Sequence, residues 1–267
     1  MIKKFLVACA LFLIGFVVPA FANDIKCEFK DGIYHIVIPE DTNIEFVSCE
    51  RLKTNRQVFN ELNPKLVVNA GFFDPKNEKT ISFVYNNGML LESPIDNENL
   101  VFNETIMENW LKVSNRTEFR VTSKGGLLVY DITPHNTVYA GRLIASAQAG
   151  PMLLPKLQLE EEFFVVRDTN GNVKRESASV LSKTARTLIG IKNGEVHIFI
   201  VTNQHPMNIY EARDLCLKHG MEKAMAFDGG SSTSFDYKNG DVEYHVTSIG
   251  IPSDNTGRRL KSFLVVK

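Results

Sequence analysis

Short runs of apolar residues alternate with polar turn residues along most of this chain. Runs with the length and the β-branched or aromatic content of strands lie at 33–38, 43–48, 65–73, 125–132, 161–173, 223–228 and 259–267. Asn-Gly pairs add hairpins, because both residues tolerate the positive φ angles of tight turns. Asn87-Gly88 predicts a hairpin over 80–90, and Asn193-Gly194 predicts another over 186–202. Asn170-Gly171 marks a turn within 161–173.

Only a few segments have the residue spacing of a helix. Residues 208–220 repeat apolar side chains at helical intervals and end at Gly220, as helices often do. A second helix is expected over 54–62, before Asn63-Pro64. Many strands, few helices and their mixed order predict an α+β fold in one continuous domain.

The segment 92–124 is more polar and irregular than its surroundings. It contains the only tryptophan, Trp110, within a candidate helix over 104–113. We interpret the whole segment as an insertion or a flap.

The first 22 residues have the pattern of a signal peptide. A basic start is followed by the apolar run FLVACALFLIGFVV and by the small-x-small site Ala20-Phe21-Ala22. The apolar run is short for a membrane span, so cleavage before Asn23 is favoured over an uncleaved anchor. A lipoprotein would need Cys9, which has too little apolar sequence before it. We therefore expect an exported protein, periplasmic or secreted, whose domain spans 23–267 and does not remain inserted in a membrane.

Composition and charge limit the kinds of molecule that the protein is expected to bind. The chain is 44% hydrophobic and 23% charged, which is ordinary for a globular protein. Without the leader it has 28 basic and 31 acidic residues, a net charge of −3. A chain with this charge and without a basic run is not expected to bind nucleic acid.

Three cysteines remain after the leader. Cys27 and Cys49 bracket two predicted strands, and export permits disulfides, so we predict a Cys27–Cys49 bridge. Cys216 falls in the 208–220 helix, where it is expected to be a buried apolar residue. The chain has no C-x-x-C pair and no His/Cys ligand spacing, so no metal site is predicted.

Four stretches place polar residues beside small ones where strands end. Asn69 and Gly71 lie in VVNAGFFDP, Gly150 in AQAGPMLLP, Arg186 in SKTARTLIGI, and Asp228 in AFDGGSS. Alone, each is explained at least as well by a turn, a plain loop or a surface arginine paired with an acid. Together they suit a pocket for a polar, anionic small ligand. Arginine binds phosphate or carboxylate, and backbone N–H groups at a glycine turn bind anions.

These stretches, in this order, resemble the phosphodiester glycosidase family, the family of N-acetylglucosamine-1-phosphodiester alpha-N-acetylglucosaminidase. The matching sequences span 66–267, and the most specific are ARTLIGI and the helix followed by AFDGGSS. The resemblance implies a glycosidase that releases a sugar from a phosphodiester at the anomeric carbon, without a cofactor. One departure is the loop TNQHPMNIYE, where relatives often have glycine and serine.

The resemblance also implies residue roles. Arg186 and the Gly229–Ser231 turn would stabilise the leaving phosphate. Asp228 is the first candidate for the carboxylate at the anomeric carbon, Glu211 the second and Asp74 the third. The residues expected to bind substrate are Asn69, Gly71, Gly150, Thr202, Asn203, His205, Gly229, Gly230 and Ser231.

Two other functions stay open at this point. The bulky loop with His205 fits a glycan- or envelope-binding module that keeps the pocket but has lost turnover. A metal-dependent phosphodiesterase that cleaves a P–O bond would use the same kind of substrate.

Overall fold

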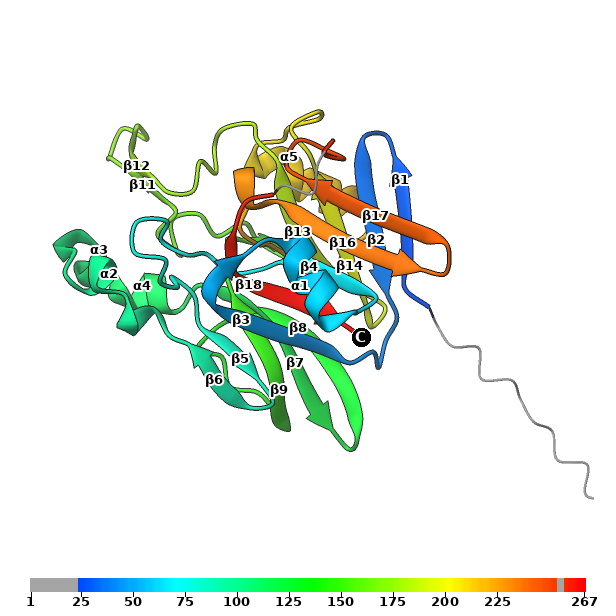
Figure 1. The fold of residues 1–267 in the computed structure, drawn as a ribbon. Helices are drawn as coiled ribbons and strands as arrows, with labels where there is room; N and C mark the ends of the chain where they lie inside the picture. Colours follow the sequence, from blue (N-terminus) through cyan, green and yellow to red (C-terminus); the bar gives the residue numbers. More distant parts are fainter. Residues whose placement is uncertain (1–23, 254–256) are drawn as a thin grey trace, which may run out of the picture.

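The strands form three large antiparallel sheets and one small hairpin (Figure 1). The computed structural model describes residues 24–253 and 257–267, so the predicted signal peptide at 1–22 lies outside the described residues. Within the described part, no helix has the length and apolar character needed to cross a bilayer. The mixed composition of strands and a few helices confirms the predicted α+β class and the single domain.

The first sheet has six strands, and one of them, β15, leads directly to Asp228. In spatial order its strands are β1 (Lys26–Lys30), β2 (Ile33–Ile38), β14 (Glu195–Val201), β13 (Arg186–Lys192), β15 (Lys223–Ala226) and β10 (Met152–Leu154). β13 and β14 form the hairpin expected from Asn193-Gly194, and both residues have positive φ angles. β13 is buried along almost its whole length because the sheet is covered on both faces.

The second and third sheets have five strands each. The second consists of β17 (Val242–Thr247), β16 (Ser234–Asn239), β4 (Leu66–Asn69), β18 (Leu260–Val266) and β3 (Ile44–Lys53). The third consists of β6 (Met89–Glu92), β5 (Val84–Asn86), β9 (Arg142–Gln148), β7 (Thr117–Lys124) and β8 (Leu127–Pro134). The small hairpin pairs β11 (Val165–Arg167) with β12 (Val173–Glu176).

Two helices cover sheet faces, and the others are short. α1 (Asn55–Leu62) packs on the second sheet through Val58 and Phe59, and α5 (Ile209–Lys218) packs on the first. The short helices are η1 (Pro94–Asp96), α2 (Glu98–Val101), α3 (Glu104–Glu108), α4 (Trp110–Ser114) and η2 (Gly230–Ser232). Cys216 is buried on the inner face of α5, as expected for a small apolar side chain.

One central core joins the three large sheets. Inward-facing residues from each sheet, such as Ile198, Phe46 and Phe119, belong to the same buried cluster. The alternation of buried and partly exposed residues along β2 places one of its faces in this core. The core fixes the sheets relative to one another, and strand ends from different sheets therefore meet at fixed positions.

Two predictions about the fold are wrong. Cys27 and Cys49 are free thiols, because the strands that carry them belong to different sheets: β1 pairs with β2, whereas β3 pairs with β18. The segment 92–124 is not one insertion, since its last eight residues form β7, an inner strand of the third sheet. The expected helix over 104–113 is divided into α3 and α4 at Asn109.

Candidate active site

Asp228 lies where the first and second sheets meet. It follows β15 by two residues, and its N–H donates to the carbonyl of Ala70, just after β4 (2.9 Å). Asn69 fixes the same junction, because its Nδ2 donates to the Asp228 carbonyl (2.6 Å). The Oδ1 atom of Asn69 accepts bonds from Thr187 Oγ1 (2.7 Å) and from the Ser234 N–H (3.0 Å). Asn69 is thus a buried residue that positions Asp228, and the predicted contact with a sugar is not supported.

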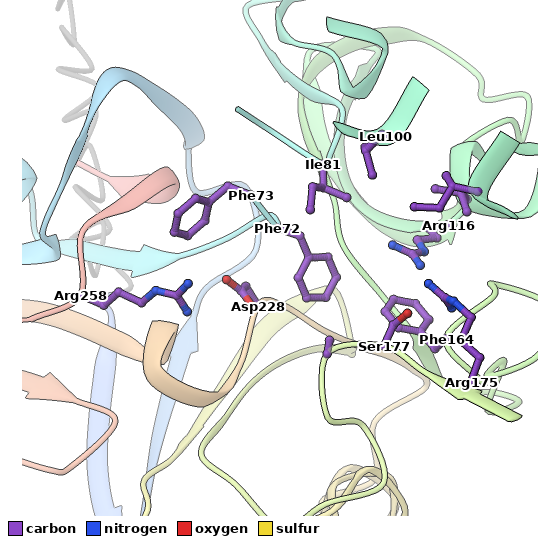
Figure 2. A pocket seen from close by; sticks show the side chains of 13 residues that line it. Phe72, Phe73, Ile81, Leu100, Arg116, Phe164, Arg175, Ser177, Asp228 and Arg258 are labelled. Atoms are coloured by element: carbon purple, nitrogen blue, oxygen red, sulfur yellow. The ribbon is translucent and has the colours of Figure 1, made fainter. Parts of the chain in front are cut away.

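The side chain of Asp228 opens into a pocket of about 270 Å³, called here the Asp228 pocket (Figure 2). The pocket is lined by Phe72, Phe73, Ile81, Leu100, Ile106, Val113, Arg116, Phe164, Arg175, Ser177, Ala178, Asp228 and Arg258. Asp228 is the one sequence-predicted site residue among them. It is also the one carboxylate among these lining residues, so it is the candidate for chemistry at a substrate carbon.

Burial controls the charge of Asp228. Loss of hydration raises its pKa to about 6, while a hydrogen bond from Ser232 and the charge of Arg258 act in the opposite direction. Figure 2 shows the guanidinium of Arg258 facing the Asp228 carboxylate. Arg258 Nη1 donates to Ser231 Oγ (2.8 Å) and Ser232 Oγ (3.0 Å). At neutral pH the group is therefore mostly a carboxylate held next to a cation.

The glycine turn after Asp228 supports the acid and does not form the expected anion-binding floor. The Gly229 N–H bonds to the Asp228 carboxylate, which helps to keep that group ionised. The Gly230 N–H donates to the Ala185 carbonyl (2.8 Å), so it is already occupied. Gly230 has a φ of +59°, a conformation that favours glycine at the start of η2. Ser231 contributes its hydroxyl to Arg258, outside the pocket lining.

Two further arginines stand on the other side of Phe72 from Asp228 (Figure 2). Arg116 precedes β7, and its Cζ lies 4.1 Å from the ring centre of Phe164. Its Nε donates to the backbone carbonyl of Glu162 (3.0 Å), and Arg175 Nη1 donates to that of Phe163 (2.7 Å). Burial lowers the pKa of Arg116 to about 10, so it remains a cation at neutral pH.

Neither arginine forms a salt bridge in the described structure, although the charge of the nearby Glu162 carboxylate partly offsets the fall that burial causes in the pKa of Arg116. Among residues 24–253 and 257–267, no carboxylate forms a salt bridge with Arg116 or Arg175. Partly desolvated guanidinium groups without an acidic partner bind phosphate strongly, because their planar forks match its oxygens. This end of the Asp228 pocket is suited to an anion.

Glu162 is a second buried acid, and its position explains why residue 150 is a glycine. Its carboxylate accepts bonds from the Met152 N–H (2.8 Å), Thr117 Oγ1 (2.7 Å) and the Thr117 N–H (3.1 Å). Loss of hydration raises its pKa to about 7. Gly150 has a φ of +94°, and a Cβ there would lie 2.2 Å from Glu162 Oε2. Gly150 therefore makes room for Glu162 and does not line the Asp228 pocket.

Gly71 has a similar packing role. A Cβ at this position would lie 2.8 Å from the Cβ of Ser82, so only glycine fits without movement. Ser82 Oγ in turn accepts the N–H of Phe72 (2.9 Å). Gly71 thereby places Phe72 in the pocket wall rather than contacting a ligand itself.

Arg186 does not point into the Asp228 pocket, contrary to its predicted role. Its Nε donates to the Met207 carbonyl (2.9 Å), and its Nη2 donates to the carbonyls of Ser179 (2.9 Å), Val180 (3.1 Å) and Ser182 (2.7 Å). The side chain is buried and ties the loop before β13 to the loop before α5. Its predicted contact with a leaving phosphate is therefore not supported by the Asp228 pocket.

The other carboxylate candidates also lie outside the pocket lining. Glu211 caps α5, because its Oε2 accepts the Asn208 N–H (2.9 Å), and it pairs with Lys183 on the surface. The hydrogen bond from Lys183 and the Asn208 N–H lower its pKa. Asp74 closes an exposed turn by accepting the Lys76 N–H (2.8 Å).

The loop between β14 and α5 is likewise separate from the Asp228 pocket. Thr202 is buried, and Asn203 Oδ1 accepts the Ala185 N–H (2.8 Å). His205 is exposed and lies against Gly32, where an added Cβ would be 2.0 Å from His205 Cδ2. The bulk of this loop therefore does not narrow the pocket, which removes the feature that favoured a binding module without turnover.

The sequence analysis missed Arg116, Arg175 and Arg258. Arg116 precedes β7, a strand that was assigned to an irregular insertion, and Arg175 lies in a short exposed hairpin. Arg258 is within GRRLKSFLVVK, one of the stretches that resembled a family, so position within that stretch was an available signal. Within the described residues, no group of three or more His, Cys, Asp or Glu side chains is placed to hold a metal ion.

Several solved structures share this fold at low sequence identity. The catalytic domain of zebrafish N-acetylglucosamine-1-phosphodiester alpha-N-acetylglucosaminidase, auto-inhibited by its pro-peptide, is 12% identical with a TM-score of 0.61; the match covers 91% of this chain and 81% of that one. A hypothetical protein from Synechocystis is 13% identical with a TM-score of 0.57, covering 91% and 61%. A protein from Burkholderia pseudomallei, named for its inferred export, is 10% identical with a TM-score of 0.60, covering 88% and 73%. At these identities the likeness establishes the fold alone.

The family itself is established by sequence. No curated protein matches the chain. The model of the phosphodiester glycosidase family matches residues 63–267, which is most of the chain and includes Asn69, Asp228 and all three pocket arginines. The chain therefore belongs to the phosphodiester glycosidase family.

Proposed function

We propose that this protein hydrolyses a sugar-1-phosphodiester at the anomeric carbon, with Asp228 acting at that carbon. One observation carries the proposal: Asp228 shares a single pocket with Arg116 and Arg175, which form no salt bridge with a carboxylate among the described residues. The pocket thus places a carboxylate and an anion-binding pair within reach of one small molecule. The membership in the phosphodiester glycosidase family supports the same reaction.

The chemistry needs few groups from the protein. The bond between the anomeric carbon and the phosphate oxygen breaks, and its electron pair leaves with the phosphate. Positive charge develops on the sugar ring, where the Asp228 carboxylate stabilises it and acts as nucleophile or base. Water supplies the new hydroxyl on the sugar, and its proton goes to solvent. A phosphomonoester is already a good leaving group, so the arginines need only stabilise its charge.

The likeness to the zebrafish enzyme makes N-acetylglucosamine the first sugar to test. Export is part of the proposal, since the amino-terminal pattern is that of a signal peptide and the Burkholderia structure is named for inferred export. A glycan or sugar phosphate of the cell envelope would then be the substrate.

The test is hydrolysis of an N-acetylglucosamine-1-phosphodiester in ¹⁸O-labelled water. Cleavage at the anomeric carbon gives free sugar and an unlabelled phosphomonoester, whereas cleavage of a P–O bond puts ¹⁸O on phosphorus. Label on phosphorus, or a rate abolished by EDTA and restored by a divalent metal, would establish the phosphodiesterase alternative. Binding of a panel of such diesters without turnover would establish the binding module instead.

A further inference from the structure

One wall of the Asp228 pocket is apolar and comes from the short helices. Leu100 belongs to α2, Ile106 to α3 and Val113 to α4, and Ile81 joins them from the loop before β5. Figure 2 shows Ile81 above Phe72, and Leu100 above it and toward Arg116. Eight of the thirteen lining residues are apolar, so the pocket offers a substrate more hydrocarbon contact than hydrogen bonding.

The order of groups in the pocket indicates which part of a substrate meets this wall. Asp228 must reach the anomeric carbon, so the sugar lies at its end, near Phe72 and Phe73. Arg258 is engaged at that end with Ser231 and Ser232. The phosphate is expected at Arg116 and Arg175, across Phe72. The alcohol on the far side of the phosphate then continues toward α3 and α4.

The arginine end and the apolar wall are physically joined. Val113 lies three residues before Arg116, at the end of α4. Lys112 Nζ, also in α4, donates to the carbonyl of Glu160 (3.2 Å), which ties α4 to the segment leading to Phe164. A group that leaves the arginines is therefore next to hydrocarbon.

We infer that the alcohol of the phosphodiester is apolar, so that the substrate class is a sugar-1-phosphate esterified to an alkyl or lipid chain. This inference rests on the proposed function. A polar alcohol such as glycerol would lose hydration against Ile106 and Val113 without gaining hydrogen bonds there. An alkyl chain gains about fourfold in affinity for each methylene group that it buries.

The experiment compares two diesters of one sugar, an octyl phosphate and a glycerol phosphate, below the concentration at which the octyl compound aggregates. The expected kcat/KM is at least about tenfold higher for the octyl diester. Ile106→Asn should lower the ratio of kcat/KM for the octyl diester to kcat/KM for the glycerol diester about tenfold. Met107→Asn is the matched control, since Met107 is the next residue of α3, is exposed and does not line the pocket.

Each outcome is decisive. Equal rates for both diesters with the wild-type protein would overturn the apolar substrate class and leave the proposed reaction standing. An equal loss on both diesters with Ile106→Asn would show that the wall contacts the shared sugar, which also overturns the inference. If the wild-type protein hydrolyses neither diester although its circular dichroism and melting transition show that it is folded, the proposed function and this inference both fail.

Discussion

The two ends of the Asp228 pocket are built in different ways. The Asp228 end is made from the last residues of strands in two sheets, locked by Asn69 and by backbone hydrogen bonds. The arginine end is made from the residue before β7, the β11–β12 hairpin and the helices α2–α4, which lie in connections between strands of the large sheets. The strand ends thus hold Asp228 rigidly, and the connections around it form the part of the pocket that would select the substrate.

The largest effect on turnover is expected from a substitution at the Asp228 end of the pocket. Asp228→Asn keeps the shape of the side chain but removes the charge that we propose acts at the anomeric carbon. We expect kcat to fall about 1,000-fold or more, with little change in KM. Steady-state kinetics with a sugar-1-phosphodiester, together with the melting temperature, checks this prediction. A variant that kept more than a tenth of wild-type turnover would show that Asp228 is not the reacting group.

A smaller loss is expected at the arginine end. Arg175→Ala removes one of two cations that face the phosphate, so kcat/KM should fall about 100-fold. Lys174→Ala is the matched control, because Lys174 is the neighbouring residue in β12 and does not line the pocket. Equal effects of the two substitutions would mean that general positive charge, and not a contact with phosphate, is what matters.

The pH dependence of the wild-type protein distinguishes the possible roles of Asp228. Its pKa is raised to about 6, and the proposed reaction needs the ionised form. Below that pKa, kcat/KM should fall about tenfold per pH unit, and it should be level from about pH 7 upward. A general acid would give the opposite profile, with activity lost as pH rises through 6. The profile of kcat/KM from pH 4.5 to 8.5 separates the two cases.

The sequence predicted the Asp228 end of the pocket better than the arginine end for a physical reason. Asn69 ends β4 and Asp228 comes two residues after β15, and hydrophobic runs predicted both of these buried strands. Arg186 was chosen by the same rule, but no short pattern shows that its guanidinium bonds to the carbonyls of Ser182, four residues before it, and of Met207, 21 residues after it. Partners far along the chain are set by the packed core, which short patterns do not encode.

The sequence analysis also missed β16 and β17 and predicted a wrong disulfide, and only the second error shows the same limit. β16 and β17 alternate about Asn239-Gly240, so this hairpin was detectable from its turn. Cys27 and Cys49 bracket adjacent strands in sequence, yet β2 pairs with β14 and β3 with β18. Sheet partners with large sequence separation, and hence the distance between those thiols, are decided by which faces bury together.

The smallest effect on turnover is expected from Glu162→Gln, although Glu162 is also a buried acid with a raised pKa. Glu162 is bonded to Thr117 and Met152 and does not line the pocket, so kcat/KM should change by less than about threefold. Its effect is on stability instead. A carboxyl whose pKa is about 7 in the folded state and near 4.5 when unfolded binds more protons when folded. The wild-type protein should therefore lose about 3 kcal/mol of stability from this group as pH rises from 4.5 to 7.

The glutamine variant stays uncharged and lacks that loss. Urea unfolding at pH 5, 6, 7 and 8 gives the difference in free energy of unfolding between variant and wild type, which cancels the titration of every other group. This difference should shift in favour of the variant as pH rises and become constant from about pH 8 upward. Glu161→Gln, the exposed neighbour paired with Lys156, should show no such shift. A flat difference for Glu162→Gln would mean that Glu162 is ionised at low pH, and that Arg116 and Thr117 compensate its burial more fully than its surroundings indicate.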